Sequence, residues 1–443
     1  MTLNTAQTIR AVSDRREPSG SAQPLAPITV LQAVPAIRER LTCLDAYRGF
    51  VILIMTWVNF IGEMPGIPDW LKHAPATQDG FTFPDLVFPG FLFIVGIAIP
   101  LAIGKIRDTS VASLPVIGHI CGRAFGLLLA GVMLVNAPRY DADISLLPRA
   151  LYCVLLYVSM ILLWKQGTEK KSYFWIGAAL MAFLMVTFRG KTDVEFHSVY
   201  LETSWWGILG MIGWTYLCCS LVYVATRGSS TALMGVLGFM IAVYMGGHEG
   251  MLDFIPDWIE DTIGIGTMFG SVSANVLAGT LIGNLFLETR ISATDDPATQ
   301  RAIHRRRLKF MFFFAAGLVL AGVLLRPYHH ISKIGATESF TLVCGGINLF
   351  AFSIFYFLMD VMQWRTWAAF LVPAGINALF AYILPDLWRQ VLDMLGLGDM
   401  WWRFGWPFLQ SGGPIGLINA AVVAMFMFSL VALASRKGLR LKF

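Results

Sequence analysis

The stretch from Lys72 to Pro100 places a histidine in a short loop that leads directly into an apolar segment. An imidazole changes charge near neutral pH, so His73 at a membrane boundary could take a proton from a reacting group and pass it on, as a general base does. A single loop histidine is more commonly a solvated side chain. The residues around His73 therefore decide how it is interpreted.

Two polar residues lie where they could support His73. Asn59 is near the end of an apolar segment, and the glycines and prolines of residues 62–68 then forbid a continuous helix, so the chain turns back and brings Asn59 near His73. Asp85 stands at the start of the next apolar segment, where a helix N-terminus favours a negative charge. Asp85 is equally consistent with a plain helix cap.

An acid and a base, Asp45 and Arg48, lie three residues apart at the start of the first apolar segment. On a helix they share one face. They are either a local ion pair that reaches the lipid headgroups or a polar cluster that anchors the anionic part of a cofactor. The residues alone leave both interpretations open.

The elements that must position these residues are strongly apolar. Hydrophobic residues make up 56% of the 443 residues and charged residues 14%, more than a soluble domain needs for its core. Segments of roughly 20 apolar residues cross the hydrocarbon layer, and their continuous hydrophobicity indicates helices instead of barrel strands. We therefore predict an all-α, polytopic transmembrane bundle of 11 or 12 helices, near residues 44–62, 86–104, 115–136, 147–164, 173–188, 206–225, 231–246, 263–287, 308–325, 340–360, 368–384 and 414–434.

The distribution of Lys and Arg predicts the orientation of the bundle. Alternate connections place 22 of these residues on one side and 8 on the other, and the richer side is expected to be cytoplasmic. Both termini are then cytoplasmic. The net charge of +5 reflects this asymmetry, and we expect no nucleic-acid partner.

The chain divides into a tail and one membrane domain. Residues 1–40 are polar, lack the apolar core of a cleavable signal and are predicted to be a disordered cytoplasmic tail. No linker interrupts residues 41–435, which we interpret as one transmembrane domain, followed by a short basic cytoplasmic tail over residues 436–443. The six cysteines show no metal-binding spacing, so we expect no metal.

Several of these motifs carry a resemblance to a known family. They are Leu44-Asp45-x-x-Arg48-Gly49, Val58-Asn59, Lys72-His73-Ala74, and the run from Gly80-Phe81-Thr82 through Asp85-Leu86-Val87-Phe88-Pro89 to Gly96, with weaker matches at Ile331-Ser332-Lys333, Thr337-x-Ser339-Phe340 and Gly375-Ile376-Asn377. Together they resemble the heparan-α-glucosaminide N-acetyltransferase family, which consists of transmembrane acyltransferases that use acetyl-CoA. The match is specific over residues 41–104 and loose over residues 105–300.

The resemblance implies a membrane acetyltransferase that moves an acetyl group from cytoplasmic acetyl-CoA to the glucosamine-like amine of an amino sugar on the extracytoplasmic side. It implies that His73 is the active-site histidine, as general base or transient acetyl carrier, with Asn59 as its polar partner. The other candidates are Arg48, Arg123 and Asp45 for binding the coenzyme, and Asp85, Lys333 and Asn377 for binding the substrate or supporting the site.

The chain also departs from the family pattern. The loop after His73 is two residues longer and lacks a tryptophan, which leaves the acceptor more open than the acyl-transfer chemistry. We also expect no large folded domain before the first helix, unlike the lysosomal enzyme of the family. We therefore expect a bacterial inner-membrane protein that acts on a cell-envelope or imported amino sugar, with a homodimer as a further expectation from the family.

Two other classes of protein remain. A sugar or glycolipid transporter could keep the fold without acyl transfer, in which case His73, Asp85 and Lys333 would bind protons or substrate. Binding of coenzyme A separates this alternative from an enzyme, because a transporter has no need of it. A structural membrane subunit is the third class, and the polar residues Asn59, His73, Asp85 and Asn377 argue mildly against it.

Overall fold

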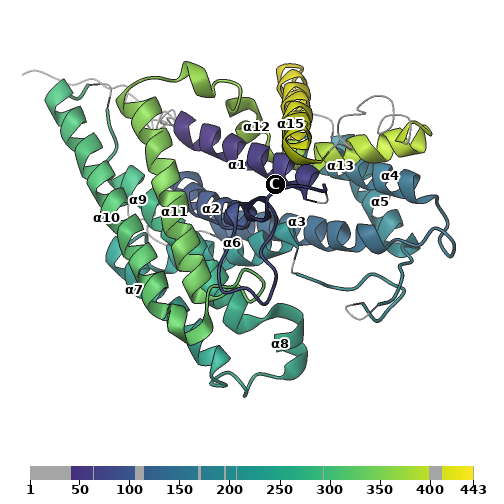
Figure 1. Cartoon of the computed structure of the whole chain (residues 1–443), viewed down its shortest axis with the longest axis horizontal. Coiled ribbons are helices and arrows are strands. Elements are labelled where there is room, and N and C mark those ends of the chain that lie inside the picture. Colours follow the sequence, from purple (N-terminus) through teal and green to yellow (C-terminus); the bar gives the residue numbers. More distant parts are fainter. Residues whose placement is uncertain are drawn as a thin grey trace, which may run out of the picture. The chain divides into compact units, whose positions relative to one another are not determined.

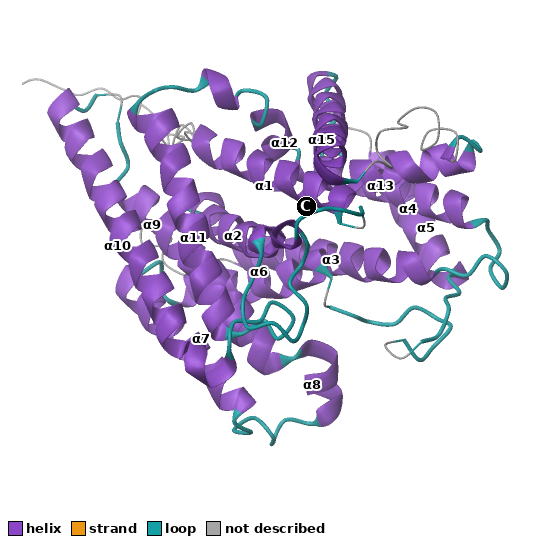
Figure 2. Cartoon of the chain, in the orientation of Figure 1, coloured by secondary structure: helices purple, strands orange, loops and turns teal. Residues whose placement is uncertain are grey.

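The computed structural model describes residues 41–62, 64–104, 114–167, 171–193, 196–205, 207–292, 294–398 and 412–442. Within these ranges every regular element is a helix, apart from two isolated bridges (Figure 2). The predicted all-α class is confirmed. The expected N-terminal tail, residues 1–40, lies outside the described residues.

Nine helical stretches in the described part of the chain are long and apolar enough to cross a membrane. This supports an integral, multi-pass membrane protein. The stretches are α1 (Thr42–Ile61), η2 with α2 (Phe83–Leu86 and Val87–Ile103), α3 with η4 (Leu114–Asn136 and Ala137–Arg139), α6 (Ile208–Ala225), α7 (Ser230–His248), η5 with α9 (Gly266–Val272 and Ser273–Glu288), α10 (Pro297–His329), α11 with η6 (Glu338–Tyr356 and Phe357–Val361) and α15 (Gly413–Arg436).

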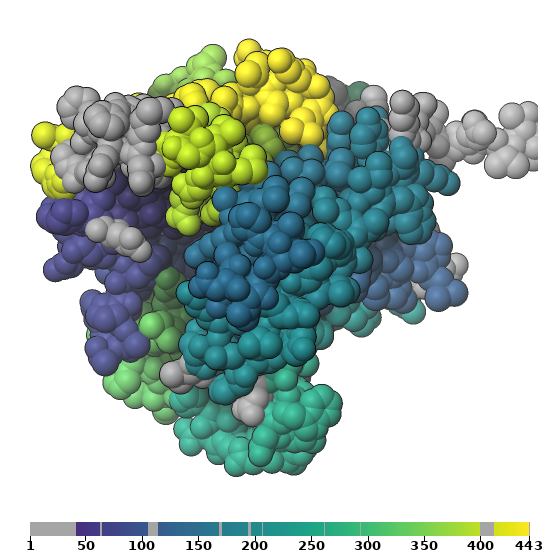
Figure 3. Space-filling model, turned by 90° about the vertical axis from the view of Figure 1, so that its right-hand side faces the viewer, coloured from purple at the N-terminus to yellow at the C-terminus, as the bar shows by residue number. Residues whose placement is uncertain are grey.

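The remaining helices are shorter. Two of them, α4 (Arg149–Trp164) and α5 (Lys171–Thr187), are apolar. The other short elements are α8 (Asp257–Ile263), α12 (Val372–Ile376), α13 (Ala378–Met394) and the 3-10 turns η1 (Asp69–Leu71) and η7 (Thr366–Ala368). Figure 3 shows α13 in yellow-green lying against the blue segment that contains α4.

Helix α10 is longer than the sequence predicts. It begins at Pro297, inside the predicted connection, because the carboxylate of Asp296 accepts hydrogen bonds from Ala298 N and Thr299 N and caps the helix. Proline at the first helical position fits the same start. The predicted segment, residues 308–325, covers only the apolar part, since hydropathy does not detect polar helical turns.

The predicted helix over residues 368–384 is wrong. The chain forms α12 and α13 instead, with a break at Asn377. The buried amide of Asn377 donates to Ser435 Oγ and to the carbonyl of Leu439, and it accepts from Leu441 N. The break therefore ties this junction to the C-terminal residues, a long-range contact that local hydropathy cannot reveal.

Close backbone packing joins α2 to α9, and α10 lies along α11 (Figure 1). A Cβ atom on Gly279 would come within 2.1 Å of the carbonyl oxygen of Phe93, and one on Gly96 within 1.9 Å of that of Val276. Such contacts allow two membrane helices to approach at backbone distance. They hold the middle of α2 against α9.

We predict that Gly279→Val destabilises the protein by at least about 1–3 kcal/mol, because the side chain would overlap backbone that cannot move aside. Gly122→Ala on α3 is the control, since a Cβ there meets nothing within 4 Å. Thermal unfolding in detergent measures both. A Gly279→Val protein as stable as wild type would contradict this packing.

Candidate active site

His73 lies in the loop between α1 and α2, and a buried residue holds that part of the loop. Leu71, 2% exposed, ends the turn η1 and packs with Ile61, Ile67 and Ala420. Lys72 and His73, which follow, are not part of this apolar cluster. The side chain of His73 is half exposed as a result.

The carboxylate of Asp85 is the centre of the site, although its side chain is fully buried. Its Oδ2 accepts hydrogen bonds from Ala74 N at 3.1 Å and Thr82 N at 3.0 Å, and the Thr82 hydroxyl lies 2.9 Å away. Its Oδ1 lies 2.7 Å from His73 Nδ1. The Thr82 hydroxyl has one hydrogen and also lies 2.5 Å from the carbonyl oxygen of Lys72. Without it, four groups with available hydrogens, counting the lysine described next, surround the two oxygens, an arrangement that suits an ionised carboxylate.

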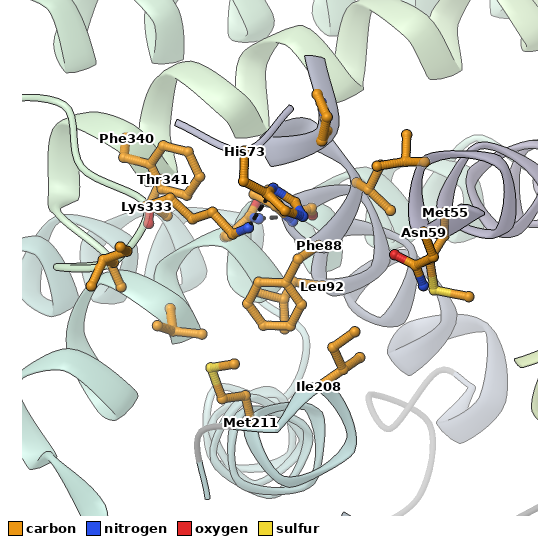
Figure 4. Close-up of a pocket in the computed structure, with 18 residues that line it drawn as sticks. Met55, Asn59, His73, Phe88, Leu92, Ile208, Met211, Lys333, Phe340 and Thr341 are labelled. Atoms are coloured by element: carbon orange, nitrogen blue, oxygen red, sulfur yellow. Dashed lines mark hydrogen bonds between the residues drawn. The ribbon is translucent and has the colours of Figure 1, made fainter. Parts of the chain in front are cut away.

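Lys333 reaches the same carboxylate from the turn between α10 and α11. Its Nζ is 3.1 Å from Asp85 Oδ1 and 2.8 Å from His73 Nδ1 (Figure 4). An ammonium group only donates, so Nδ1 cannot both accept from Lys333 and donate to Asp85. We assign Nδ1–H to Asp85, since an ionised carboxylate is the stronger acceptor. The other nitrogen, Nε2, then carries the lone pair that a base needs.

Asp79 joins the loop of His73 to the turn of Lys333. Its Oδ1 accepts from Ile331 N at 2.8 Å, its Oδ2 lies 3.0 Å from Arg326 Nε, and Gly80 N donates to Ile331 O. The Ile331 N–H and the guanidinium of Arg326 lower the pKa of Asp79 below its ordinary value of 3.8. The link is therefore charged and intact at neutral pH.

A buried pair closes the base of the same turn. Helix α10 ends at His329 and α11 begins at Glu338, and His329 Nδ1 lies 2.9 Å from Glu338 Oε1. Both side chains are buried. Sequence reasoning missed this pair, because its partners are separated by the turn itself and share no helical spacing.

A cavity of about 440 Å³ opens beside His73. Most of its lining is apolar, and the polar side chains are few, as is usual for a small-molecule site. Its lining comes from α1, the loop of His73, α2, α6, the η5–α9 junction, the turn of Lys333 and the start of α11. The polar residues of the lining are Asn59, His73, Asn275, Lys333 and Thr341.

The structure brings four of the predicted site residues together and places four elsewhere. Asn59 lines the cavity from α1, with His73 and Lys333, and Asp85 holds those two in place. Within the described residues no hydrogen bond joins Asn59 to His73. Figure 4 shows the two on different walls. The residues that do not line this cavity are Asp45, Arg48, Arg123 and Asn377.

Those four residues have other contacts. Arg48 lies 3.4 Å from Asp45 and donates to the carbonyl of Gly375 on α12. The guanidinium of Arg123 lies over the ring of Tyr216, 4.8 Å from its centre. Asn377 is held at the junction of α12 and α13, as described above.

Sequence reasoning also missed Asn275, a cavity-lining residue on α9 that is 2% exposed. A signal was available, because an amide inside a membrane span is costly and is commonly kept for function. It was overlooked because no motif surrounds it.

Residues 40–284 match the family described as Domain of unknown function (DUF5009). The chain belongs to this family. The matched region includes the loop of His73, the start of α2 and Asn275, and it ends before the turn of Lys333. The family description names no activity.

Two curated relatives of this DUF5009 chain carry an enzyme's name. Heparan-alpha-glucosaminide N-acetyltransferase of Mus musculus is 32% identical over 139 residues, which are 31% of this chain and 20% of the mouse protein. The Homo sapiens protein of the same name is 36% identical over 105 residues, 24% of this chain and 15% of the human one. The match thus spans about a fifth or less of the length of these relatives.

We predict that Asp79→Asn loosens both loops at neutral pH, because the neutral amide loses the charged contact to Arg326. The group's lowered pKa means that its stabilising contribution is present above about pH 4 and is lost as the pH falls through the lowered value. Amide hydrogen exchange in residues 72–82 and 330–337 should become severalfold faster. Asp69→Asn is the control, since Asp69 makes only an exposed pair with Lys72, and equal exchange in both variants would contradict the link.

Proposed function

We propose that this protein is a membrane acetyltransferase that moves the acetyl group of cytoplasmic acetyl-CoA to the amine of an amino sugar on the extracytoplasmic side. The observation that carries the proposal is the Asp85–His73 pair at the edge of a mostly apolar cavity. The partial likeness to two N-acetyltransferases supports it. The chemistry then follows from which nitrogen of His73 is free.

In the proposed reaction His73 acts as a general base. The acceptor nitrogen attacks the thioester carbonyl carbon, a C–N bond forms and the C–S bond breaks. His73 Nε2 takes the proton that the nitrogen loses and returns it to the departing thiolate, which leaves as the thiol of coenzyme A. Asp85 holds Nδ1–H throughout, so the imidazole keeps the orientation and tautomer that the transfer needs.

A second route keeps the same residues. His73 could carry the acetyl group transiently on Nε2 before the amine attacks. In both routes negative charge develops on the carbonyl oxygen. Asn59, which lines the same cavity, is proposed to donate to that oxygen, and Lys333 supplies positive charge nearby.

The coenzyme requires cations near the cytoplasmic ends of the helices. Arg48 and Asp45 lie at the start of α1, and Arg123 lies within α3. We propose that Arg48 and Arg123 bind the coenzyme's phosphates and that Asp45 orients Arg48, to which it is already paired. Asn377 supports this end through its contacts to the C-terminal residues.

The sidedness follows from the Lys and Arg distribution. The loop of His73 and the turn of Lys333 both lie on the predicted extracytoplasmic side, and both termini are then cytoplasmic. The proposed setting is a bacterial inner membrane, with a cell-envelope or imported amino sugar as acceptor. A homodimer is part of the proposal.

We predict that His73→Ala lowers kcat for acetyl transfer from acetyl-CoA to glucosamine by roughly 10²–10⁴-fold, the usual contribution of a general base. His197→Ala is the matched control, because His197 is an exposed loop histidine away from the cavity. Transfer of radiolabelled acetyl by the purified protein measures both. The absence of both coenzyme A binding and transfer in wild type and in His73→Ala would favour the transporter.

Asp85→Asn tests the tautomer. The amide oxygen is expected to keep the contacts to Ala74 N and Thr82 N, which places the NH₂ group against His73 Nδ1. That group donates to Nδ1 and moves the ring proton to Nε2, where a base must have its lone pair. We predict a loss in kcat similar to that of His73→Ala with thermal stability kept closer to wild type than in Asp85→Ala, and full activity would refute the assignment.

Sealed membrane vesicles test the sidedness, because acetyl-CoA does not cross a bilayer. Inside-out vesicles loaded with glucosamine should acetylate it when acetyl-CoA is added outside. Right-side-out vesicles should acetylate glucosamine in the medium only when acetyl-CoA is loaded inside. Activity with donor and acceptor on the same side alone would contradict the proposed direction of transfer.

A further inference from the structure

A buried acceptor in the wall of the cavity has no partner among the described residues. Asn275 Nδ2 donates to the carbonyl of Pro89 at 2.8 Å, and this bond determines which way the amide is turned. Among the described residues, Oδ1 of Asn275 has no hydrogen-bond partner, although the residue is 2% exposed. An unsatisfied buried oxygen is costly and calls for an explanation.

The surroundings of Asn275 are built to keep its oxygen in place. A Cβ atom on Gly345 of α11 would lie 2.9 Å from Oδ1, so glycine at this position lets the oxygen stay where it is. Five residues before Asn275 the π-helical segment η5 departs from helical geometry at Gly270, with φ −89° and ψ −105°. Irregular turns of this kind often occur at functional sites.

A second polar group stands near it. Thr341 lies one turn before Gly345 on α11, lines the same cavity and is 5% exposed. Its hydroxyl makes no hydrogen bond to any described residue. Residues four apart on a helix have Cβ positions about 5–6 Å apart. One acceptor and one hydroxyl donor, both unpaired within the described residues, therefore lie at neighbouring places in the wall of the cavity.

We infer that Asn275 and Thr341 bind a secondary amide of the acyl donor, and this inference rests on the proposed function. The Oδ1 of Asn275 accepts the amide N–H, and the Thr341 hydroxyl donates to the amide carbonyl. In an acyl-CoA thioester the first amide is two methylene groups from the sulfur. An amide at that place would lie in the cavity when the thioester carbon is beside His73.

The apolar lining favours the donor arm over the sugar. Leu92, Met211 and Val272 line the cavity with Asn275, and a sugar placed there would leave several hydroxyl groups without partners. A chain of methylene groups with one amide needs one acceptor and one donor. These are the two groups that the cavity offers.

Two small thioesters test the inference. S-acetyl-N-acetylcysteamine carries the amide, and 2-(acetylthio)ethyl acetate replaces its N–H by an ester oxygen and keeps its carbonyl. With glucosamine as acceptor, wild type should prefer the amide roughly three- to tenfold in kcat/KM, the effect of one hydrogen bond. Asn275→Ala should bring this ratio close to one, mainly by lowering the rate with the amide.

The controls separate binding from structure. Ser273→Ala should keep the wild-type ratio, because Ser273 is buried on the same helix, its hydroxyl donates to Met268 O, and it does not line the cavity. Thr341→Val should slow both thioesters equally, since both have the carbonyl. Where turnover is too slow, thermal stabilisation by the two compounds gives the same ratio.

The outcomes are distinct from those of the proposed function. If wild type transfers acetyl from acetyl-CoA but its kcat/KM ratio for the amide over the ester is near one, the enzyme activity is supported and the amide-binding site is contradicted. An unchanged ratio in Asn275→Ala overturns it as well, and an effect on the KM for glucosamine alone assigns Asn275 to the acceptor. Thermal stabilisation by the amide compound without any acetyl transfer would support the amide-binding site and contradict the proposed enzyme activity. If Asn275→Ala does not fold, the wild-type ratio decides alone.

Discussion

The candidate site depends on one buried negative charge. A carboxylate with no exposed surface must be surrounded by donors, and Asp85 finds them in the loop of His73 and in the turn of Lys333. The same contacts that compensate for its burial place the imidazole and the ammonium within hydrogen-bond distance. Loss of this charge would therefore affect the geometry of two segments about 260 residues apart in sequence.

The helices beneath Asp85 hold it by a different force. Gly96 and Gly279 let α2 and α9 meet at backbone distance, and polar side chains then join the neighbouring helices. Asn348 of α11 accepts from Tyr47 of α1 at 2.7 Å and donates to the carbonyl of Leu86. Inside a membrane span such amides need partners from adjacent helices. The cavity keeps its shape because its walls are joined in this way.

The helical class and most helix positions could be predicted from hydropathy, since a span must be long, apolar and internally hydrogen-bonded. Predictions were wrong where other forces set the limits. Asp296 starts α10 far upstream of its apolar part, and Asn377 divides a segment whose composition is that of one helix. For Asp45 and Arg48 the ion pair expected from their spacing is present, and a role toward a coenzyme remains a proposal.

The sequence by itself determined that the protein is a helical membrane bundle and that His73, Asn59 and Asp85 belong to one neighbourhood, because short loops keep such residues close. Only the tertiary structure decided that Lys333 meets Asp85, that His329 and Glu338 close the turn carrying it, and that Asn275, in the cavity wall, has an oxygen without a partner among the described residues. These contacts join residues that share no local spacing. They arise from helix packing, which brings distant segments together.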